Sequence, residues 1–458
     1  MLYFDNKINF IGVLMMQTHV RIIAQYYDIT TGDVIDADII SDDVLLKAPT
    51  LKEFGYLHEE QINIIKGLQD FKLKHQILLN YPKICPICNN KTHKHGVVKS
   101  TFHAALTDHS VLVQRVSCKC GWGNSPSIEG IFGSDVHPDL LKKQALQGSN
   151  QSFEKSSISL NAESANSRAI NNHSQIMRAV KTVSEQLEIL KTAVINNTDA
   201  TVSELIANID GGHIKSRGEN RSFEAMVTTV YSQENLKHIN KSHNIITSKT
   251  TVASAKDDNQ QTIKAMFKHA CLSQGMNNET TVVCLADGAT NCKNIAFSIQ
   301  EDCKQMYYIL DWFHLSMKFK NIAIAEEYKE QYDKIKWHLW HGNVDNALRR
   351  LLEFKSIKTI ADNKPLLLKL NKIETYIINN SDGIVNYDER KNAKQVFTSN
   401  VAESTVNNLI NDRQKGKQQM LWSREGAHNV LQIRASVYSN TWDNDWKEIE
   451  SYLYPLAA

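Results

Sequence analysis

The stretch Thr281-Val-Val-Cys-Leu-Ala-Asp287-Gly-Ala289 says most about the fold of this 458-residue chain. Its first part, Thr281–Ala286, is a short and largely apolar run, which is typical of a strand buried on both faces of a sheet. The run ends in an aspartate followed by glycine, and a glycine lets backbone or substrate approach closely. The stretch therefore predicts a central strand that carries a carboxylate to one edge of a sheet.

Strands and helices alternate on both sides of this stretch. Three strand-like segments precede it: Glu204–Ile209, Ala225–Tyr231 and Asn244–Ala253. They are followed by a helix whose apolar positions, from Ile263 to Cys271, fall on one stripe. After the stretch, a polar helix near Asn291–Cys303 leads to a second apolar run, Met306–Leu310. This succession predicts an α/β layer architecture, and it matches the order of elements in the ribonuclease-H-like fold.

Changes in composition mark the other parts of the chain. The N-terminal part holds a strand at Thr18–Tyr27 and a helix around Glu59–Leu79, with no chemical signature. A stretch rich in Cys, His, Gly and Lys follows, and then three polar helices, with Pro138 placed to start the first and Gly148 to end it. We predict six parts: an N-terminal α/β segment of unknown role (1–80), a zinc knuckle (81–134), a helix-turn-helix module (135–192), the first part of the catalytic domain (203–314), a helical insertion (315–395) and the second part of the catalytic domain (396–445).

The overall composition is that of an ordinary globular protein. Hydrophobic residues make up 42% of the chain and charged residues 22%, which is too apolar for global disorder. No apolar run approaches the roughly 18–20 residues that span a bilayer, and polar residues interrupt the opening Met1–Met16 stretch. We therefore expect a cytoplasmic protein with no membrane partner. The net charge of +2 neither demands nor excludes a nucleic acid, because binding depends on how Lys and Arg are clustered.

Three strand-like runs each end in an aspartate: Asp210, Asp287 and Asp311. An open α/β sheet places its functional site at the carboxyl ends of its strands, so these side chains are candidates for one site. A single Asp-Gly pair indicates no more than a turn that ends a strand. Two such acids on the predicted first and fourth strands, together with a glutamate on a later helix, are harder to explain in that way.

That glutamate is Glu403, which shares the inward-facing stripe of its predicted helix with Val406 and Ile410. A bare carboxylate on this stripe is costly, and metal ions would remove the cost by supplying the countercharge. The alternative is that Asn400 caps the helix, with Glu403 at the capping-box position. Two divalent ions about 3.5–4 Å apart are the usual apparatus of phosphodiester cleavage, and oxygen ligands favour Mg²⁺ or Mn²⁺.

Several segments together resemble motifs of bacterial insertion-sequence transposases of the ISKra type, within the wider Mutator-like group of DDE transposases. These segments are Asp210-Gly-Gly212, Ala286-Asp287-Gly-Ala289, Leu310-Asp311-Trp-Phe-His314, Asn386-Tyr-Asp-Glu-Arg390, Val401-Ala-Glu403-Ser-Thr-Val-Asn407 and Lys417–Ala427. The resemblance covers about Asp210 to Arg434. It implies a ribonuclease-H-like domain interrupted by a helical insertion, and an enzyme that cleaves double-stranded DNA at element ends and transfers the 3′-hydroxyl into target DNA. It also implies a homo-oligomer.

By the same resemblance, Asp210, Asp287 and Glu403 match the catalytic triad that holds the two ions. Asp311 and His314 match a short motif that the family carries between its second aspartate and its glutamate. Asp311 is a rival for the second metal-ligand position, and His314 is expected to orient the scissile phosphate or to donate a proton. Two alternatives stay open: a zinc-containing DNA-binding regulator with an inactive nuclease fold, and a carboxylate-pair hydrolase such as a glycosidase.

The eight cysteines divide into a cluster of four and four scattered ones. Cys85-Pro-Ile-Cys88 and Cys118-Lys-Cys120 offer four thiolates on two tight turns, which suits structural tetrahedral Zn²⁺. The histidines between the pairs could replace a thiolate: His93, His95, His103 and His109. A redox pair is the alternative, but the thioredoxin-like context for it is missing. The scattered cysteines are expected to be small core residues.

Two regions are candidates for contact with DNA. In the helix-turn-helix module, Gln175 and Arg178 would read base edges and Lys181 would meet phosphate. Beyond the glutamate, a basic stretch has a composition that suits a DNA backbone. Its cations are Arg413, Lys415, Lys417, Arg424 and Arg434. The alternative for the polar helices is that their scattered lysines form plain solvated faces.

Overall fold

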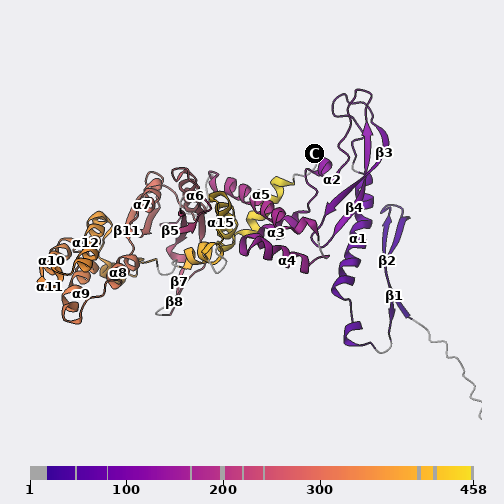
Figure 1. Ribbon diagram of the computed structural model, residues 1–458. Helices are drawn as coiled ribbons and strands as arrows, with labels where there is room; N and C mark the ends of the chain where they lie inside the picture. The colour runs from indigo at the N-terminus through magenta and orange to yellow at the C-terminus, as the bar shows by residue number, and fades with distance from the viewer. Residues whose placement is uncertain are drawn as a thin grey trace, which may run out of the picture. The chain divides into compact units, whose positions relative to one another are not determined.

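The computed structural model describes residues 18–46, 49–79, 81–165, 168–195, 202–218, 221–240, 243–399, 404–415 and 420–454. These residues fall into two compact units (Figure 1), and the division runs through the helices α3 (Pro138–Asn150) and α4 (Phe153–Ala162). Unit 1 consists of 18–143 and 157–172, and unit 2 of 144–156 and 173–454. No helix of the described part is both long enough and apolar enough to cross a membrane.

Unit 1 begins with an antiparallel hairpin of β1 (Thr18–Tyr27) and β2 (Val34–Leu45). A 3-10 turn, η1 (Leu51–Glu53), leads to the long helix α1 (His58–Leu79). The predicted strand and helix of this part are confirmed. The sequence did not indicate β2, because its four aspartates belong to a residue type that is depleted in strands.

A second hairpin lies between the two cysteine pairs, formed by β3 (His93–His103) and β4 (Asp108–Ser117). A short helix, α2 (Ile128–Phe132), follows it. Ile77 of α1, Val111 and Val113 of β4, and Ile128 form one buried cluster, so α1 packs against β4. Sequence reasoning assigned metal-binding turns to this region and missed the strands between them.

The prediction of three polar helices after this region is confirmed by α3, α4 and α5 (His173–Thr192), with the 3-10 turn η2 (Ala169–Asn171) before α5. The prediction that Gly148 ends the first helix is wrong, because α3 continues to Asn150. A Cβ on Gly148 would lie 2.7 Å from Val180 and 2.8 Å from Ile176 of α5. The glycine is therefore needed for close helix packing and not for a helix end.

Unit 2 is built on a five-stranded mixed sheet in the order β11-β10-β5-β6-β9. Its strands are β5 (Glu204–Lys215), β6 (Ser222–Ser232), β9 (Thr250–Ser254), β10 (Thr281–Ala286) and β11 (Gln305–Leu310). β5, β10 and β11 are parallel, and β6 is antiparallel to both β5 and β9. The predicted strand β10 is confirmed at both ends, and β11 is one residue longer than predicted.

Three other predicted strands differ from those observed. β6 extends beyond the predicted Ala225–Tyr231 at both ends. β5 does not end at Ile209 but continues through Asp210 to Lys215, because it stays paired with β6 as far as Ser222. The predicted strand Asn244–Ala253 is two strands, β8 (His243–Ile246) and β9. β8 pairs with β7 (Leu236–Asn240), which follows the 3-10 turn η3 (Gln233–Asn235), in a separate hairpin.

Helices cover both faces of this sheet. On one face α6 (Gln261–Ser273) buries its predicted apolar stripe against β5 and β10, together with α7 (Thr290–Ala296) and the 3-10 turn η4 (Phe297–Ile299). The other face contributes Ile206, Val283 and Leu285 to a core shared with the helices that follow β11. α15 (Arg424–Tyr438) packs on the edge strand β9 and on α5. The last helix, α16 (Trp442–Leu453), contacts α5 and α15.

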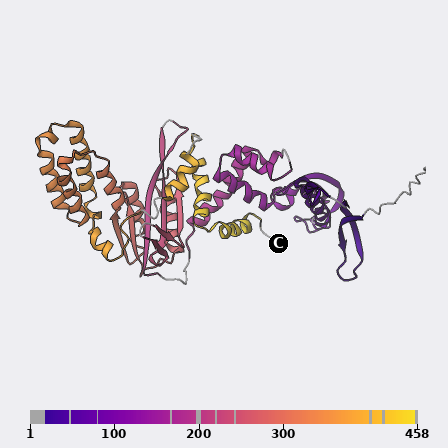
Figure 2. The same ribbon diagram turned by 90° about the horizontal axis from the view of Figure 1, so that it is seen from below.

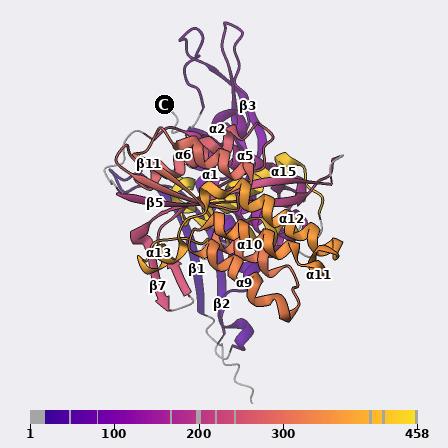
Figure 3. The same cartoon turned by 90° about the vertical axis from the view of Figure 1, so that its left-hand side faces the viewer.

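A group of helices follows β11, where the sequence predicted a helical insertion. It consists of α8 (Trp312–Lys320), α9 (Glu326–Trp340), α10 (Val344–Ser356), α11 (Lys358–Ala361), α12 (Lys364–Asn379), the 3-10 turn η5 (Ser381–Gly383) and α13 (Tyr387–Asn392). These helices lie beyond the β11 edge of the sheet (Figure 2), and Figure 3 looks directly onto α9, α10 and α12. Their buried residues form one cluster with those of β10 and β11, so insertion and sheet share a core.

The chain then returns to the sheet through α14 (Ser404–Val406), which runs into the π-helix η6 (Asn407–Lys415). Two residues of this segment meet Gly212 of β5. A Cβ on Gly212 would lie 2.6 Å from Ile410 and 3.3 Å from Val406. The Arg434 guanidinium fixes η6 by donating to the carbonyl oxygens of Leu409 and Asn408.

Candidate active site and cysteine cluster

Each of the three aspartates directly follows a strand residue, and these three strand residues are aligned with one another across neighbouring strands. Ala286 of β10 lies in register with Ile209 of β5 on one side and with Leu310 of β11 on the other. Asp210, Asp287 and Asp311 each follow one of these residues. Neighbouring strands lie about 4.8 Å apart, so three carboxylates leave the backbone from adjacent points. The sequence prediction that these acids share one edge of the sheet is confirmed at the level of the backbone.

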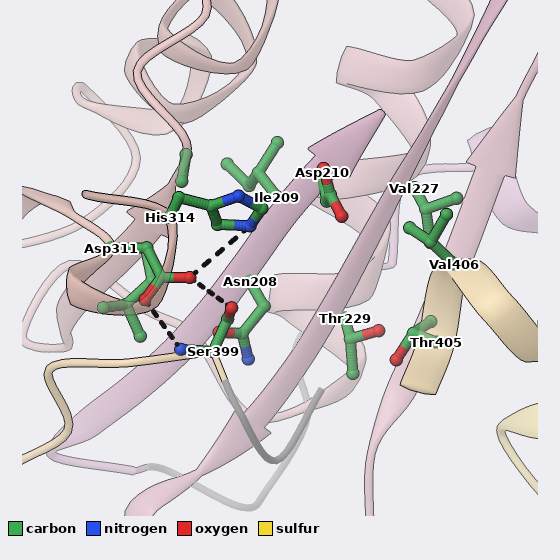
Figure 4. A pocket seen from close by; sticks show the side chains of 12 residues that line it. Asn208, Ile209, Asp210, Val227, Thr229, Asp311, His314, Ser399, Thr405 and Val406 are labelled. Carbon is green, nitrogen blue, oxygen red and sulfur yellow. Dashed lines mark hydrogen bonds and ion pairs between the residues drawn. The ribbon is translucent and has the colours of Figure 1, made fainter. Parts of the chain in front are cut away.

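A pocket lies where these strands meet the chain after the insertion (Figure 4). Asp210, Asp311 and His314 line it together with Ser399. The other lining residues are Asn208, Ile209, Val227, Thr229, Leu285, Ala286, Thr405 and Val406. The pocket therefore combines two acids and an imidazole from the predicted site.

Asp311 is completely buried and satisfied by hydrogen bonds. Its carboxylate accepts from the backbone N–H of Phe313 at 3.0 Å and from the backbone N–H of Ser399 at 3.1 Å, and also from the Ser399 hydroxyl. His314 Nε2 lies 3.6 Å from Asp311 Oδ2. Asp311 thus caps α8 and anchors the segment that returns from the insertion. Ser399 was missed from the sequence, because this contact joins residues 88 positions apart.

Asp210 has fewer partners. One oxygen accepts from the backbone N–H of Gly211 at 2.7 Å. Burial raises the pKa of Asp210, and the nearby charges of Asp287 and Asp311 raise this pKa further, whereas the Gly211 N–H and His314 act in the opposite direction. A buried carboxyl among other carboxyls gains most from a cation beside it.

Asp287 lies in the turn between β10 and α7 and does not line the pocket. Its Oδ1 accepts from the backbone N–H of Ala289 at 2.9 Å, and its carbonyl oxygen accepts from the hydroxyl of Tyr376 at 2.6 Å. Burial and the nearby Asp287 charge raise the pKa of Cys292 in α7. Asp287 and Asp210 therefore follow neighbouring residues of two adjacent strands, but the Asp287 carboxylate is hydrogen-bonded within the turn that follows β10.

Glu224 of β6 is a further carboxylate beside this site that sequence reasoning missed. Its Oε2 accepts from the Asn291 side chain at 2.7 Å, and its Oε1 lies 2.6 Å from the position that a Cβ on Gly211 would occupy. The glycine after Asp210 therefore makes room for this side chain. No motif surrounds Glu224 in the sequence, and only the pairing of β5 with β6 brings it here.

Glu403 and Lys417 lie outside the described residues. The described residues nearest to Glu403 are Ser399 before it and Ser404 after it. Ser399 and Thr405 both line the pocket. Across the described part of the chain, the aspartates do not come as close together as the cysteines do. Only the cysteines form a group of at least three metal-ligand side chains whose ligand atoms all lie within 4.8 Å of one another.

The four cysteines from the two predicted turns meet in unit 1. Cys85 Sγ lies 3.6 Å from Cys120 Sγ, and Cys88 Sγ lies 3.4 Å from Cys118 Sγ. These four thiols could bind a metal ion such as zinc. None of the four histidines between the pairs belongs to the group.

Backbone hydrogen bonds shape both cysteine turns. In the first, the N–H of Cys85 donates to Asn90 and the N–H of Asn89 donates to Cys85. The second repeats the pattern, since the N–H of Cys118 donates to Trp122 and the N–H of Gly121 donates to Cys118. Asn89 and Gly121 both have positive φ, 55° and 93°, which closes each turn tightly. The backbone N–H of Asn90 and the neighbouring thiols lower the pKa of Cys88 to about 7, which favours its thiolate.

The predicted base-reading residues lie on α5. Arg178 is exposed and donates to Gln175 at 3.2 Å. Lys181 forms an ion pair with Glu425 at 2.5 Å, on the first turn of α15. Lys181 is therefore engaged within the protein, and Arg178 remains accessible from solvent.

The predicted cations after η6 have different surroundings. Arg413 is buried, donates to the Gly148 carbonyl at 3.4 Å and lies over the rings of Phe153 and Trp422. Burial and the charge of Arg434 lower the pKa of Arg413 to about 10. Arg424 donates to the Ala255 carbonyl at 3.2 Å and pairs with Asp257 at 3.6 Å. Lys415 is exposed.

Comparison of the chain with protein-family models finds no match, and comparison with curated proteins finds none either.

Proposed function

We propose that this chain is a DNA transposase that cleaves phosphodiester bonds at the ends of a mobile element and joins the freed 3′-hydroxyl to target DNA. The observation that carries the proposal is the row of Asp210, Asp287 and Asp311, each of which directly follows one of three aligned residues on adjacent parallel strands. Such a row concentrates negative charge where an α/β sheet holds its functional site. The motifs that resemble ISKra-type transposases include all three aspartates.

The sheet order supports the same proposal. Three strands in antiparallel succession, followed by two parallel strands reached through helices, give β11-β10-β5-β6-β9, with β5 at the centre. We infer from this order that the sheet belongs to the ribonuclease-H-like class. The helices of 312–392 then interrupt the domain between β11 and α14, as the resemblance implies.

The acidic row suits divalent cations. Asp210 is buried with its pKa raised, so a bound cation would relieve the cost of its charge. Asp210, Asp287 and Glu403 are the proposed ligands of two Mg²⁺ or Mn²⁺ ions, with Asp311 as the rival of Asp287. Bound ions of this kind stabilise charge on the attacking and leaving oxygens. Asp311, fixed by Ser399, orients His314 beside Asp210, where the imidazole is placed to contact a phosphate oxygen.

The cysteine cluster is proposed to hold zinc in a structural role. Four thiolates suit tetrahedral Zn²⁺ and leave no open position for water. The two turns belong to unit 1, whereas the acidic row belongs to unit 2. Zinc would therefore stabilise the unit that holds it and take no part in bond cleavage.

One observation favours a second candidate, a zinc-containing DNA-binding regulator with an inactive nuclease fold. The carboxylates of Asp287 and Asp311 are hydrogen-bonded to local N–H groups, and those of Asp210, Asp287 and Asp311 form no close group of ligands among the described residues. An active enzyme has to bring these oxygens together when DNA and metal bind. A regulator does not.

Cleavage of supercoiled plasmid separates the two candidates. The wild-type protein is expected to nick plasmid in Mg²⁺ or Mn²⁺ and not in Ca²⁺, and Asp210→Asn and Glu403→Gln are each expected to reduce the rate at least a hundredfold. Glu301→Gln, at an exposed acid away from the site, is the matched control and should retain the wild-type rate. Nicking that survives both active-site substitutions would overturn the proposal. Tight DNA binding without any metal-dependent nicking would favour the regulator.

A further inference from the structure

The cysteine turns and the hairpin between them form a strongly basic lobe, defined here as residues 83–123. This lobe contains six lysines and arginines and a single acidic residue, Asp108. The acid does not neutralise the cations, because it is held by Arg168 at 2.5 Å and by His103 at 2.8 Å. Even with the two negative charges that four thiolates around a divalent ion would add, the lobe keeps a clear positive excess.

All six cations are exposed: Lys83, Lys91, Lys94, Lys99, Arg115 and Lys119. None of them forms an ion pair with another described residue, although every residue of 81–165 is described. Lys94 lies over the ring of Tyr81, with 4.8 Å from Nζ to the ring centroid. Exposed cations that form no internal ion pair are available to bind an external anion.

This excess is local. The net charge of the whole chain is only +2, and the preceding residues 18–79 contain ten acidic and six basic side chains. The cations are also spread along the lobe and not gathered at one point. They occur in the first cysteine turn, along β3, on β4 and in the second turn. A line of charges of this kind suits the regular spacing of phosphates along a nucleic-acid backbone and not a single phosphate group.

We propose that the basic lobe binds duplex DNA, with its exposed lysines and Arg115 against the phosphates. The two-stranded ribbon of β3 and β4 favours this occupant, because the major groove of B-form DNA admits such a ribbon, whereas the major groove of A-form RNA is too narrow for side chains to read. The choice of DNA rests on the proposed function, which it extends by adding a contact surface in unit 1. The metal at the cysteines would then hold the ends of the ribbon in shape for this contact.

The test is a binding titration with the full chain. The probe is a fluorescent duplex of random sequence about three helical turns long, and the buffer contains neither Mg²⁺ nor chelator. A lobe variant combines Lys83→Gln, Lys91→Gln, Lys99→Gln and Arg115→Gln, which leaves all four cysteines in place. The matched control removes four exposed lysines of the helical insertion: Lys358→Gln, Lys364→Gln, Lys369→Gln and Lys372→Gln.

The lobe variant is expected to bind at least tenfold more weakly than wild type. The slope of log affinity against log salt is expected to fall by about 3–4, because each cation that no longer neutralises a phosphate lowers it by roughly 0.9. The control variant should stay within twofold. Metal content and the unfolding curve, measured on the same samples, show that the lobe variant is folded.

Equally weakened binding in the lobe and control variants, or unchanged binding in both, would overturn the proposal. The proposal would also be overturned if the full chain bound vesicles rich in phosphatidylserine in preference to DNA, and if the lobe variant lost that binding. Because binding is measured without Mg²⁺, the result is separate from the proposed catalysis. A protein that never nicks plasmid but binds DNA more weakly in the lobe variant would support this surface and count against the enzyme.

Discussion

The hydroxyl of Tyr376, on α12 of the helical insertion, donates a 2.6 Å hydrogen bond to the carbonyl oxygen of Asp287. A second tyrosine of the insertion repeats the contact one strand further on, since the Tyr387 hydroxyl donates to the carbonyl oxygen of Leu310 at 2.7 Å, directly before Asp311. Burial raises the pKa of both phenols, so both remain donors. The insertion therefore holds the backbone at two of the three aspartates.

The Tyr376→Phe substitution tests this support. Removal of the hydrogen bond is expected to cost about 1 kcal/mol of stability and to lower the rate of plasmid nicking about tenfold, because small displacements of catalytic groups are expensive. Tyr328→Phe is the matched control, since its hydroxyl bonds to Thr359 at 2.6 Å on the exposed surface of the same insertion. Unfolding curves and nicking rates measure both effects. A Tyr376→Phe protein that nicks at the wild-type rate would show that the contact is not needed for activity.

Gly288 is expected to be intolerant of substitution. Its φ is +87°, and a Cβ there would lie 2.6 Å from the Asn380 side-chain oxygen. Gly288→Ala is therefore expected to cost about 2–3 kcal/mol, from backbone strain and from the clash with Asn380. Gly133→Ala carries similar strain at φ +76° but has open space, and it should cost about 1 kcal/mol. Thermal unfolding distinguishes them, and equal destabilisation would rule out a contribution from Asn380.

Zinc content tests the cysteine cluster. The purified chain is expected to contain about one zinc ion, and Cys118→Ser is expected to remove most of it, because all four thiolates are needed for a closed tetrahedral site. Cys303→Ser is the control, because this half-buried thiol lies in unit 2, away from the cluster. Elemental analysis of the two variants gives the answer. Full zinc occupancy in Cys118→Ser would mean that a different set of ligands holds the ion.

A contact between Glu188 of α5 and the buried His428 of α15 joins these two helices, and the ionisation of Glu188 makes stability depend on pH. His428 Nε2 lies 3.2 Å from the Glu188 carboxylate, which also pairs with Lys256. The His428 hydrogen bond and Lys256 outweigh burial and lower the pKa of Glu188 to about 2. Because the folded-state pKa is depressed, the stabilisation is complete above the ordinary value near 4.5 and is lost as the pH falls toward 2.

Glu188→Gln is accordingly expected to lower the free energy of unfolding by about 1–3 kcal/mol at neutral pH. The difference from wild type should shrink steadily below about pH 4.5. Urea unfolding at several pH values measures it. Glu185→Gln on the same helix, where the acid contacts Lys181 only at 3.8 Å, is the control and should show little effect at any pH. A constant difference across the pH range would contradict the assignment.

The central strands were predictable because their signal is local. The run Thr281–Ala286 is apolar throughout its length and ends at an acid, so both its burial and its end can be read from the sequence. β2 and β3 could not be predicted in this way, because β2 contains four aspartates and β3 contains several lysines and histidines. Their pairing with neighbouring strands, and not their composition, makes them strands.

The same distinction holds at the candidate site. The positions of Asp210, Asp287 and Asp311 follow from where apolar runs stop, so the sequence predicted that they share one edge. The residues that fix them, Ser399 and Tyr376, lie 88 and 89 positions away from their partners and carry no motif. Only tertiary packing brings such residues to the site, and a single sequence contains no signal for it.

The arginines of η6 and α15 bear on where the chain can be cut. Arg413 donates to the Gly148 carbonyl, and Arg434 donates to Ser149 and to Asn150, all on the last turn of α3. A fragment that starts at β5 would leave the buried Arg413 guanidinium without its Gly148 acceptor and would remove two of the four acceptors of Arg434, so it is expected to be poorly stable. We therefore expect an independently stable fragment of unit 2 to begin at or before residue 144. Truncated versions made to crystallise the unit that contains the three aspartates should keep the second half of α3.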